Sequence, residues 1–360
     1  MSPTWRVLDT GVREAAENIA LNRALLDALA SGEAPPTLRF LRFRPCALLG
    51  FHQSVDQELD LDYCRAQGIA VSRRITGGGA IYCDEAQLGW ELYAHKRDFG
   101  HASLAVISER ICQAAVAGIR TLGVDAAFRP RNDIEVDGRK ISGTGGIFEG
   151  DALLYQGTLL IEFDIERMLR VLKIPAEKLS DKAIASARDR VSSLKDILGS
   201  PPALPEVKAR LLGAFEREFG VSGVEGTLNR AERGRLEQTL AEIDGEDWVR
   251  LIDRPTGDQP LHEAWVKTSG GLLRARARFD VPSGRLKQVW FTGDFFISPR
   301  RTVADLEAAL RDTALEGLEA RIEAFFEGRG VDMLGLRPAD FAWVVRAALE
   351  APALAPGTAA

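Results

Sequence analysis

The chain has 360 residues, 46% of them apolar and 27% charged, and a formal net charge of −6 at pH 7. This length and balance predict a soluble globular protein with one large and one smaller domain, and they argue against a broad basic surface for duplex nucleic acid. No apolar run approaches the roughly 20 residues that span a bilayer, and the N-terminus lacks a charged region before an apolar core, so we expect a cytoplasmic protein without membrane attachment.

Helices and strands alternate in the first part of the chain. Residues 13–30 carry apolar side chains at three- and four-residue spacing and stop at Ser31-Gly32, which predicts an amphipathic helix. Residues 38–50 contain two brief apolar stretches bounded by proline and glycine, which predicts strands.

A further helix and a hairpin follow. Residues 103–123 have helical periodicity, with Ser103 as N-cap and a glycine as terminator. Residues 134–163 have the pattern strand, turn, strand, and Asp137-Gly138 is a strong signal for a two-residue hairpin turn. This stretch also concentrates glycine.

The spacing of apolar residues changes again after residue 200. Residues 200–246 are predicted to be helical, and their opening sequence SPPALP forbids regular structure locally and marks a joint. Residues 272–281 alternate apolar and basic side chains, which predicts a half-exposed antiparallel strand, and residues 284–296 supply its hairpin partner. Helices are predicted at 303–313 and 316–328.

The succession of elements predicts a fold of mixed α/β class in two domains. The larger spans residues 1–245, and a small α+β domain spans residues 246–350. Residues 351–360 are poor in large apolar groups, so we expect a frayed, flexible tail. We find no internal repeat.

Cysteine and histidine argue against metal and disulfide chemistry. The cysteines are too irregularly spaced for C-x-x-C motifs and too few for a disulfide scaffold, so reduced thiols are expected. The histidines are scattered without H-x-x-x-H spacing, which disfavours a histidine-based metal site. These residues are Cys46, Cys64, Cys83, Cys112, His52, His95, His101 and His262.

Residues 73–84, RRITGGGAIYCD, place two arginines before three consecutive glycines. Such a run costs backbone entropy and is usually kept where another group must approach the main chain closely. Glycine amides can donate to phosphate oxygens, and Arg73 and Arg74 supply positive charge, so a nucleotide is one such group. The alternative is a hairpin loop beside two solvated arginines. Neither G-x-x-x-x-G-K-[ST] nor G-x-G-x-x-G is complete, which excludes a P-loop or a Rossmann motif.

Residues 131–146, RNDIEVDGRKISGTGG, form the second candidate segment. They place Asn132 and Asp133 at the mouth of one strand and Lys140 after a tight turn on the next, so Lys140 and Asp133 are expected to face each other. An Asp133 that holds Mg²⁺ and a Lys140 that faces the α-phosphate would suit attack of a carboxylate on phosphorus. The alternative is an exposed hairpin lysine.

Together the segments read R-R-x-T-G-G-G-A-[IV], N-D-I-x-V-x-G-[RK]-K-I-S-G and Q-G-T-L-L, a combination that resembles the catalytic core of the lipoate-protein ligase A family. Gly50 and Gln53 resemble its G-x-x-Q element, and residues 185–198 resemble its S-x-R-x-R-V-x-x-L stretch. Residues 270–296 resemble the start of its accessory domain. The resemblance implies a biotin/lipoate protein ligase-like core of mixed sheets with helices, followed by a small α+β accessory domain that closes over the site or swings away.

The resemblance also implies a reaction and its residues. Lipoate or octanoate and Mg-ATP form an acyl-adenylate, which a lysine of a lipoyl domain or an H-protein-like carrier then attacks, and the enzyme is expected to act as a monomer. Lys140 is implied as the catalytic residue and Asp133 as a ligand of Mg²⁺. The residues implied in binding ATP and the acid are Arg73, Arg74, Gly77, Gly78, Gly79, Ala80, Ile81, Asn132, Asp133, Lys140, Gly143, Gln156, Gly157 and Thr158.

Two positions depart from the family pattern. Cys83 stands where the family usually has histidine, and Tyr155-Gln156 stand where it often has two histidines. Cys83 raises an alternative, an octanoyl- or lipoyltransferase that uses a cysteine nucleophile and no ATP. A non-catalytic acyl-adenylate sensor and a biotin ligase are further alternatives. Ile75, Ala80 and Ile81 are expected either to line a slot for the hydrocarbon chain or to be ordinary core.

Overall fold

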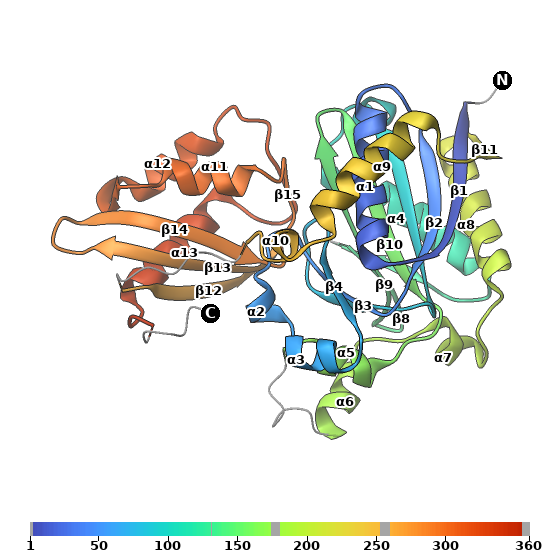
Figure 1. Ribbon diagram of the computed structural model, residues 1–360, viewed down its shortest axis with the longest axis horizontal. Coiled ribbons are helices and arrows are strands. Elements are labelled where there is room, and N and C mark those ends of the chain that lie inside the picture. Colours follow the sequence, from blue (N-terminus) through green and yellow to red (C-terminus); the bar gives the residue numbers. More distant parts are fainter. Residues whose placement is uncertain (1–2, 131, 174–180, 253–259, 355–360) are drawn as a thin grey trace.

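The computed structural model describes residues 3–130, 132–173, 181–252 and 260–354. Figure 1 shows two parts side by side: a larger one built from the N-terminal two thirds of the chain and a smaller one built from the C-terminal third, with α10 between them. We call these the main region and the C-terminal region. No helix among the described residues is long and apolar enough to cross a membrane.

A mixed sheet forms the centre of the main region. Among the described residues it has eight strands in the order β11-β1-β2-β6-β10-β9-β8-β7, with β1 parallel to β2 and β11 and all other neighbours antiparallel. Its strands are β1 (Thr4–Arg13), β2 (Thr37–Phe43), β6 (Gln87–His95), β7 (Ala127–Arg129), β8 (Asp133–Val136), β9 (Arg139–Glu149), β10 (Ala152–Leu160) and β11 (Ser222–Glu225).

Helices cover both faces of this sheet. On one face, α4 (Leu104–Arg120) and α8 (Leu204–Phe219) pack against apolar side chains of the strands. On the other face, α1 (Ala15–Ala30) and α9 (Arg230–Ile243) enclose a second hydrophobic cluster. A smaller sheet, β4-β3-β5, lies beside them: β3 (Cys46–Leu49), β4 (Ala70–Arg73) and β5 (Ile81–Cys83). The short helices are α2 (Val55–Glu58), α3 (Leu61–Ala66), α5 (Ile165–Val171), α6 (Asp181–Arg188), α7 (Leu194–Leu198), α10 (Glu246–Val249) and the 3₁₀ turn η1 (Lys96–Phe99).

The C-terminal region has its own hydrophobic cluster, drawn from residues 273–348. Its sheet has the order β12-β13-β14-β16, and β15 pairs with β17. The elements are β12 (His262–Thr268), β13 (Gly271–Asp280), β14 (Arg285–Gly293), β15 (Ile297–Ser298), α11 (Thr302–Ala309), β16 (Thr313–Ala314), the 3₁₀ turn η3 (Leu315–Gly317), α12 (Leu318–Phe326), β17 (Asp332–Met333) and α13 (Pro338–Glu350).

Most predicted elements are present. The side chain of Ser103 caps α4 by accepting from Val106 N, and Asp137 and Gly138 both have positive φ in the turn between β8 and β9. The predicted mixed α/β class is confirmed. The domain boundary proposed at residue 245 stays a prediction. Helix α10 lies beyond that residue and yet contacts β4 of the main region.

Two expectations for the second half are wrong, and a third, the frayed tail, is contradicted only at its start. Residues 200–246 are not helical throughout, because β11 pairs with β1 in parallel. The SPPALP segment is no joint between domains, because α8 begins within it and buries Val207 and Leu211 in the same cluster as α4. The start of the expected frayed tail is bound, since Leu354 N donates to Leu261 O (2.7 Å); residues 355–360 lie outside the described residues.

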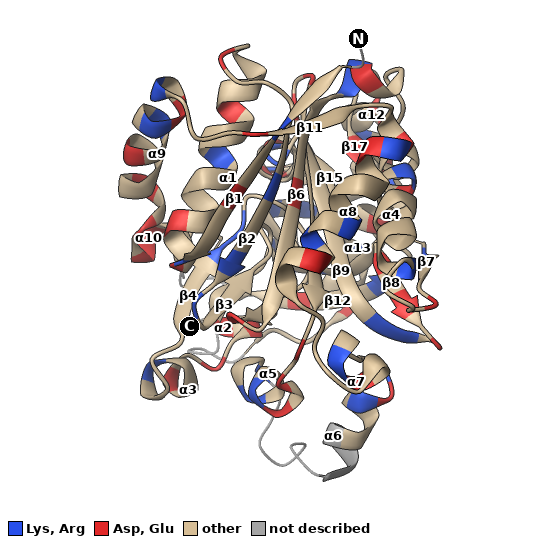
Figure 2. Ribbon diagram, turned by 90° about the vertical axis from the view of Figure 1, so that its right-hand side faces the viewer, with Lys and Arg blue, Asp and Glu red and all other residues tan. Residues whose placement is uncertain are grey.

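Charged groups are buried within the main sheet as well. Figure 2 shows acidic and basic positions interspersed over the helices, and charged positions on β2 and β6 inside the sheet. Arg39 on β2 pairs with Glu91 on β6 (2.9 Å), and Asn22 of α1 donates to the same carboxylate (2.7 Å). Because both ions are buried, the attraction to its partner offsets the free-energy cost of removing each of them from water.

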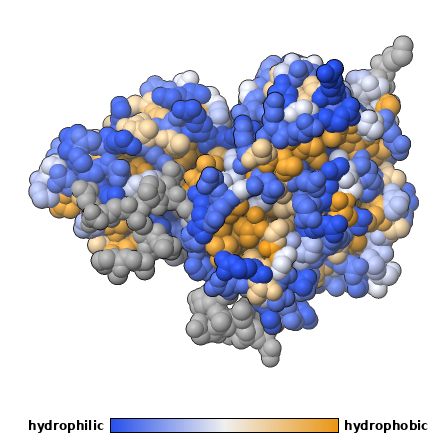
Figure 3. Space-filling view, in the orientation of Figure 1, coloured by the Kyte–Doolittle hydropathy of each residue, from blue (hydrophilic) through white to orange (hydrophobic). Residues whose placement is uncertain are grey.

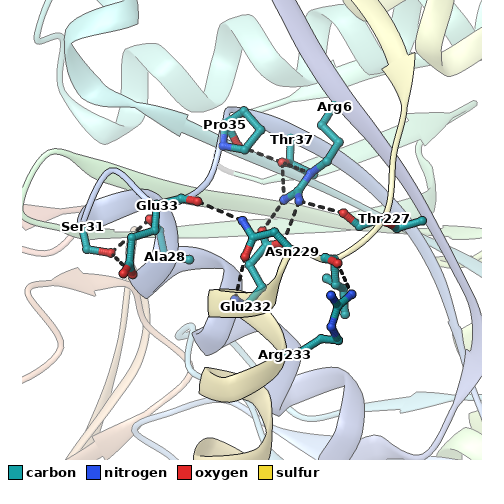
Figure 4. Close-up of polar contacts among 11 residues, drawn as sticks. Arg6, Ala28, Ser31, Glu33, Pro35, Thr37, Thr227, Asn229, Glu232 and Arg233 are labelled. Atoms are coloured by element: carbon teal, nitrogen blue, oxygen red, sulfur yellow. Dashed lines mark hydrogen bonds and ion pairs between the residues drawn. The ribbon is translucent and has the colours of Figure 1, made fainter.

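A second buried pair fixes α9 to the sheet (Figure 4). The Arg6 guanidinium on β1 donates to both oxygens of Glu232, whose side chain is fully buried, and also to Thr37 Oγ1 (3.0 Å). Glu232 in turn accepts from Asn229 N (2.7 Å), and Asn229 Oδ1 accepts from Glu232 N (2.9 Å), which completes a capping box at the start of α9. One carboxylate therefore joins a helix start to the sheet.

We predict that Glu232→Ala lowers the free energy of unfolding by about 3–5 kcal/mol, because it leaves the Arg6 guanidinium buried without its counter-ion and removes the capping box. The matched control is Glu319→Ala, which breaks the exposed ion pair with Arg346 (2.8 Å) and should have a small effect. Urea denaturation of both variants measures the difference. Equal midpoints would contradict the assigned role of Glu232.

Candidate functional site

The two segments singled out in the sequence meet around one cavity. The cavity has a volume of about 270 Å³ and lies between the loop after β4 and the β8–β9 hairpin. We call residues 76–80 the glycine loop. The cavity is lined by Arg74, Thr76, Gly77, Gly78, Gly79, Ala80, Ile81, Asn132, Asp133, Lys140, Gly143, Thr144, Gly145, Gln156, Asp294 and Phe296.

The glycine loop is crowded by protein main chain. A Cβ atom on Gly50 would lie 1.7 Å from Gly78 O, and one on Gly77 would lie 2.2 Å from Phe295 O. Gly78 also has a positive φ of 93°. The close approach inferred for this triplet is therefore real, but at Gly77 and Gly78 the approaching group belongs to the protein itself. Beside Gly79 the nearest group to an added Cβ is the Asp294 side chain, 3.6 Å away.

Arg74 is the buried cation of the cavity. Its guanidinium donates to three carbonyl oxygens, Leu48 O (3.0 Å), Gly77 O (3.2 Å) and Gly79 O (2.8 Å), which fixes the shape of the glycine loop. Burial lowers the pKa of Arg74 to about 10. No described carboxylate forms an ion pair with it. A buried guanidinium bound only to carbonyls favours an anion in the adjoining cavity.

Arg73 has a different position from the one expected. Its guanidinium does not line the cavity; it donates to Phe51 O (3.0 Å) and to the carbonyls of Trp248 (3.1 Å) and Val249, while Trp248 Nε1 donates back to Arg73 O (2.8 Å). A fully buried arginine between these carbonyls joins α10 to the loop that follows β3. Of the two adjacent arginines, only Arg74 faces the site.

Lys140 faces Asp133 as predicted. Lys140 Nζ lies 2.7 Å from Asp133 Oδ1, with the lysine side chain about one third exposed. The register of β8 against β9 shifts between Ile134 and Glu135, and Asp133 stands opposite Gly143. A Cβ atom on Gly143 would lie 2.8 Å from Lys140 Nζ, so the lysine lies flat over this glycine. The pair therefore forms one wall of the cavity.

Residues 185–198, which resemble the S-x-R-x-R-V pattern, bind the backbone of Lys140. Lys140 N donates to Arg190 O (2.8 Å), and Ser192 N donates to Lys140 O (2.9 Å). The backbone of the lysine is thus held on both sides by a segment about 50 residues later in the chain. Arg131, part of the same motif as Asn132, lies outside the described residues.

The remaining predicted residues divide between cavity and interior. Asn132 Nδ2 donates to Thr144 O (2.8 Å), and Gln156 Nε2 donates to Thr76 Oγ1 (3.3 Å), so both amides are at the cavity wall. Gly157 and Thr158 line a separate small space of about 20 Å³ behind Ile81.

The apolar residues divide in the same way. Ile75 is core, whereas Ala80 and Ile81 line the cavity. Ile81 also borders the small space behind it, which has room for about one water molecule. An acyl tail could enter that space only if its apolar walls moved.

Sequence reasoning missed Thr76, Thr144, Gly145, Asp294 and Phe296. Thr76 and Thr144 lie inside the quoted motifs, so their positions were available from the pattern. Asp294 and Phe296 come from the C-terminal region, and only their place in the resemblance to the accessory domain pointed to them. Periodicity could not bring them to a site some 150 to 220 residues away in the chain.

Of the substituted positions, Cys83 and Tyr155 are buried packing residues, whereas Gln156 lies at the cavity wall. Cys83 pairs across strands with Cys46, and burial raises the pKa of Cys83 to about 12, although Arg74 opposes the shift. Tyr155 OH lies 2.7 Å from Thr144 Oγ1 and 3.3 Å from Cys112 Sγ, and burial raises the pKa of this phenol well above its usual value. None of the four cysteines lines the cavity, and all four are buried and free.

The cavity suits only a metal ion that takes most of its ligands from a bound substrate or from water. Asp133 and Asp294 are the two carboxylates at the cavity wall, and no group of three or more potential metal ligands occurs among the described residues. Mg²⁺ is commonly held by one or two carboxylates together with phosphate oxygens and water. The donor set is consistent with Mg²⁺ carried in by a phosphate compound.

Comparison with known proteins identifies a family whose catalytic domain includes residues of the cavity. A family model described as the lipoyl protein ligase A/B catalytic domain matches residues 14–216. The chain belongs to this family. Its enzymes attach lipoyl or octanoyl groups, and the catalytic-domain match includes Arg74, the glycine loop, Asp133 and Lys140.

Curated relatives include both types of enzyme. The chain is 29% identical to the octanoyltransferase LipM of Moorella thermoacetica, over 69% of this chain and 98% of that protein. It is 30% identical to the octanoyltransferase LipM of Symbiobacterium thermophilum, over 67% and 96%. It is 28% identical to lipoate-protein ligase A subunit 1 of Thermoplasma acidophilum, over 64% and 90%. The matched part is thus about two thirds of this chain and nearly all of each relative.

Solved structures agree in fold. A bipartite lipoate-protein ligase from Thermoplasma acidophilum, solved in a study of that enzyme and its E2 lipoyl domain, matches with a TM-score of 0.61 and 26% identity, over 71% of this chain and 100% of that one. A lipoate-protein ligase A bound with ATP matches with a TM-score of 0.61 and 25% identity, over 69% and 99%. Plasmodium falciparum LipL1 matches 96% of this chain and 98% of its own, with a TM-score of 0.71 and 16% identity, which shows a shared fold.

Two further hollows lie elsewhere in the main region. One of about 370 Å³ lies among α3, β4 and α10, where Figure 3 shows apolar side chains gathered on the surface near α10 and β4. Another of about 630 Å³ is lined by charged residues around α5 and α7, including Asp84 and Lys195. Neither contains Arg74, Lys140 or the glycine loop, so neither takes part in the site.

Because burial raises the pKa of Cys83 to about 12 and also raises that of Cys46, Cys64 and Cys112, their thiols stay protonated at neutral pH. We predict that iodoacetamide at pH 8 leaves the native protein unmodified and that all four cysteines react after denaturation in urea, as measured by intact mass. Raising the pH to 9 should change little. Rapid single alkylation of the native protein would reveal a reactive thiol and contradict this assignment.

Proposed function

We propose that this enzyme is an ATP-dependent ligase that activates lipoate or octanoate as an acyl-adenylate and transfers the acyl group to a carrier lysine. One observation carries the proposal: the cavity brings together a buried cation, a lysine and glycine-loop main chain, whereas every cysteine lies outside it. This donor set suits a phosphate ester and offers no thiol for a covalent acyl-enzyme.

Each residue has a definite part in the proposed activation. Lys140 stabilises the negative charge that develops as the carboxylate attacks the α-phosphorus, and it directs the acyl oxygen. Arg74 holds the glycine loop in place and supplies fixed positive charge beside it. Asp133 orients Lys140 through their ion pair and is the residue that would contact Mg²⁺, which would supply positive charge beside the pyrophosphate when bound.

The second half-reaction needs no further group from the enzyme. The neutral ε-amine of the carrier lysine attacks the acyl carbon, the bond from that carbon to the phosphate oxygen breaks, AMP departs with the electron pair, and the proton of the amine passes to the departing phosphate or to solvent. The acceptor is a lipoyl domain or an H-protein-like carrier, a proposal supported by the E2 lipoyl domain studied with the archaeal relative. We further propose a cytoplasmic monomer.

A second candidate is transfer of an octanoyl group from an acyl carrier without ATP. It is favoured by the octanoyltransferases among the curated relatives. The positions of the thiols argue against a cysteine-dependent form of it, because the Cys83 thiol is buried between β3 and β5 with a pKa of about 12. The arrangement of Lys140 and Asp133 also argues against a non-catalytic sensor, which would not need a cation at a reacting phosphorus.

The two candidates predict opposite mass spectra. An apo lipoyl domain is incubated with the enzyme, lipoate or octanoate and Mg-ATP, and in parallel with octanoyl-acyl carrier protein and no nucleotide. The ligase adds one acyl mass only in the first mixture. Labelling only in the second mixture would overturn the ligase and establish the transferase.

A substitution in the cavity and one outside it should affect adenylation differently. We predict that Lys140→Ala reduces acyl-adenylate formation by about 10²–10³-fold, because a preorganised cation at the reacting phosphorus is lost. Cys83→Ser, a change of nearly equal volume outside the cavity, should retain adenylation. The measurement is pyrophosphate release with octanoate and ATP, and the same unfolding midpoint is required of both variants. Loss of pyrophosphate release in folded Cys83→Ser would contradict the assignment of Cys83 as a packing residue outside the site.

A further inference from the structure

The C-terminal region contacts the glycine loop through its main chain. Gly293 N donates to His52 O (3.0 Å), and Phe295 O accepts from Gly78 N (3.1 Å). The ring of His52 stacks on that of Phe295, with centroids 4.9 Å apart. Because a side chain at Gly77 would collide with Phe295 O, this close approach requires glycine at that position. Docking is thus encoded in both partners.

Phe296 differs from the residues on either side of it. Phe295 and Ile297 belong to the hydrophobic cluster of the C-terminal region, whereas Phe296 is buried yet belongs to none of the clusters formed by the described residues. Its ring lies instead against the main chain of two glycines, where added Cβ atoms would come within 2.8 Å (Gly78) and 2.4 Å (Gly145) of ring carbons. The ring forms part of the cavity wall.

The other contacts around this junction are mostly polar. Lys96 pairs with Asp332 (3.1 Å), and Arg300 pairs with Glu149 (3.2 Å), with all four side chains partly exposed. Such partly exposed pairs contribute little to stability. Removing the Phe296 ring would therefore open the cavity without taking an aromatic side chain from either hydrophobic core.

We propose that Phe296 is a site residue contributed by the C-terminal region, and that its ring shields the activated acyl group from water until the carrier lysine arrives. This inference rests on the proposed function. Without the ring, the cavity would lack its apolar wall between Gly78 and Gly145 on the side of the C-terminal region. An apolar wall at that point suits a mixed anhydride, which water destroys.

The side reaction that Phe296 suppresses is hydrolysis. The oxygen of water bonds to the acyl carbon, the bond between that carbon and the phosphate oxygen breaks, and AMP leaves with the electron pair while a proton passes to solvent. The acid is regenerated, so one ATP is consumed without acylation of the carrier. Loss of the shield should therefore raise AMP production relative to acyl-lysine production.

The test compares Phe296→Ala and Phe296→Leu with the wild type in the full-length enzyme. AMP and acylated lipoyl domain are measured with octanoate and Mg-ATP, and AMP is also measured without carrier. We expect Phe296→Ala to raise AMP release without carrier at least about tenfold and to lower the yield of acyl-lysine per AMP, with Phe296→Leu between the two. The control is Trp265→Ala, an exposed aromatic of β12, which should match the wild type.

Thermal unfolding verifies that each variant is folded. An unchanged ratio of AMP to acyl-lysine in folded Phe296→Ala would overturn the shielding role. If the wild type forms no AMP but transfers octanoyl groups from acyl carrier protein, the ligase proposal fails, and the shielding role is then decided by the ratio of free octanoate to octanoyl-lysine. A ratio raised in Phe296→Ala supports shielding in that case, and an equal ratio refutes it.

Discussion

The site depends on the approach of main chain to main chain at the glycine loop. Gly50 lies against Gly78 O, and Gly77 lies against Phe295 O, at distances where a single Cβ atom would collide. Three segments from distant parts of the sequence thus meet where no side chains separate them. Arg74 fixes the central one by donating to Gly77 O and Gly79 O. The cavity is the space left over once these backbones have been brought together.

Buried charge then determines what the cavity can hold. Arg73 and Arg74 are adjacent, both buried, and differ in what they face: Arg73 is surrounded by carbonyls that belong to the fold, and Arg74 by carbonyls that border a cavity. The first joins α10 to the core, and the second leaves its charge uncompensated by any described carboxylate.

Local patterns predicted the local structure well. The hairpin turn at Asp137-Gly138 and the cap at Ser103 depend only on neighbouring residues, and both are present. Lys140 opposite Asp133 also followed from strand pairing across that turn. The segment at residues 222–225 was missed because it forms a strand only through its pairing with β1, and its own composition shows no strand pattern.

The parts of the site that could not be predicted come from long-range packing. The direction of Arg73 depends on α10, which lies some 175 residues later in the chain, so two neighbouring arginines could not be told apart in the sequence. The glycine triplet predicted that some group lies close to the main chain, but the sequence did not identify that group. The structure supplies the answer for Gly77 and Gly78, and it adds Phe296 to a wall that the motifs alone would have left open.

The contacts of Arg73 and the glycine loop have a consequence for how the protein is made. Arg73 and Gly78 leave the ribosome early, but their partners Trp248 and Phe295 emerge only after about two thirds and four fifths of the chain have been synthesised. Since domains generally fold as they emerge, the main sheet can assemble around an unfinished site. A chain that ended before residue 295 would have its main sheet formed but its cavity still lacking one wall.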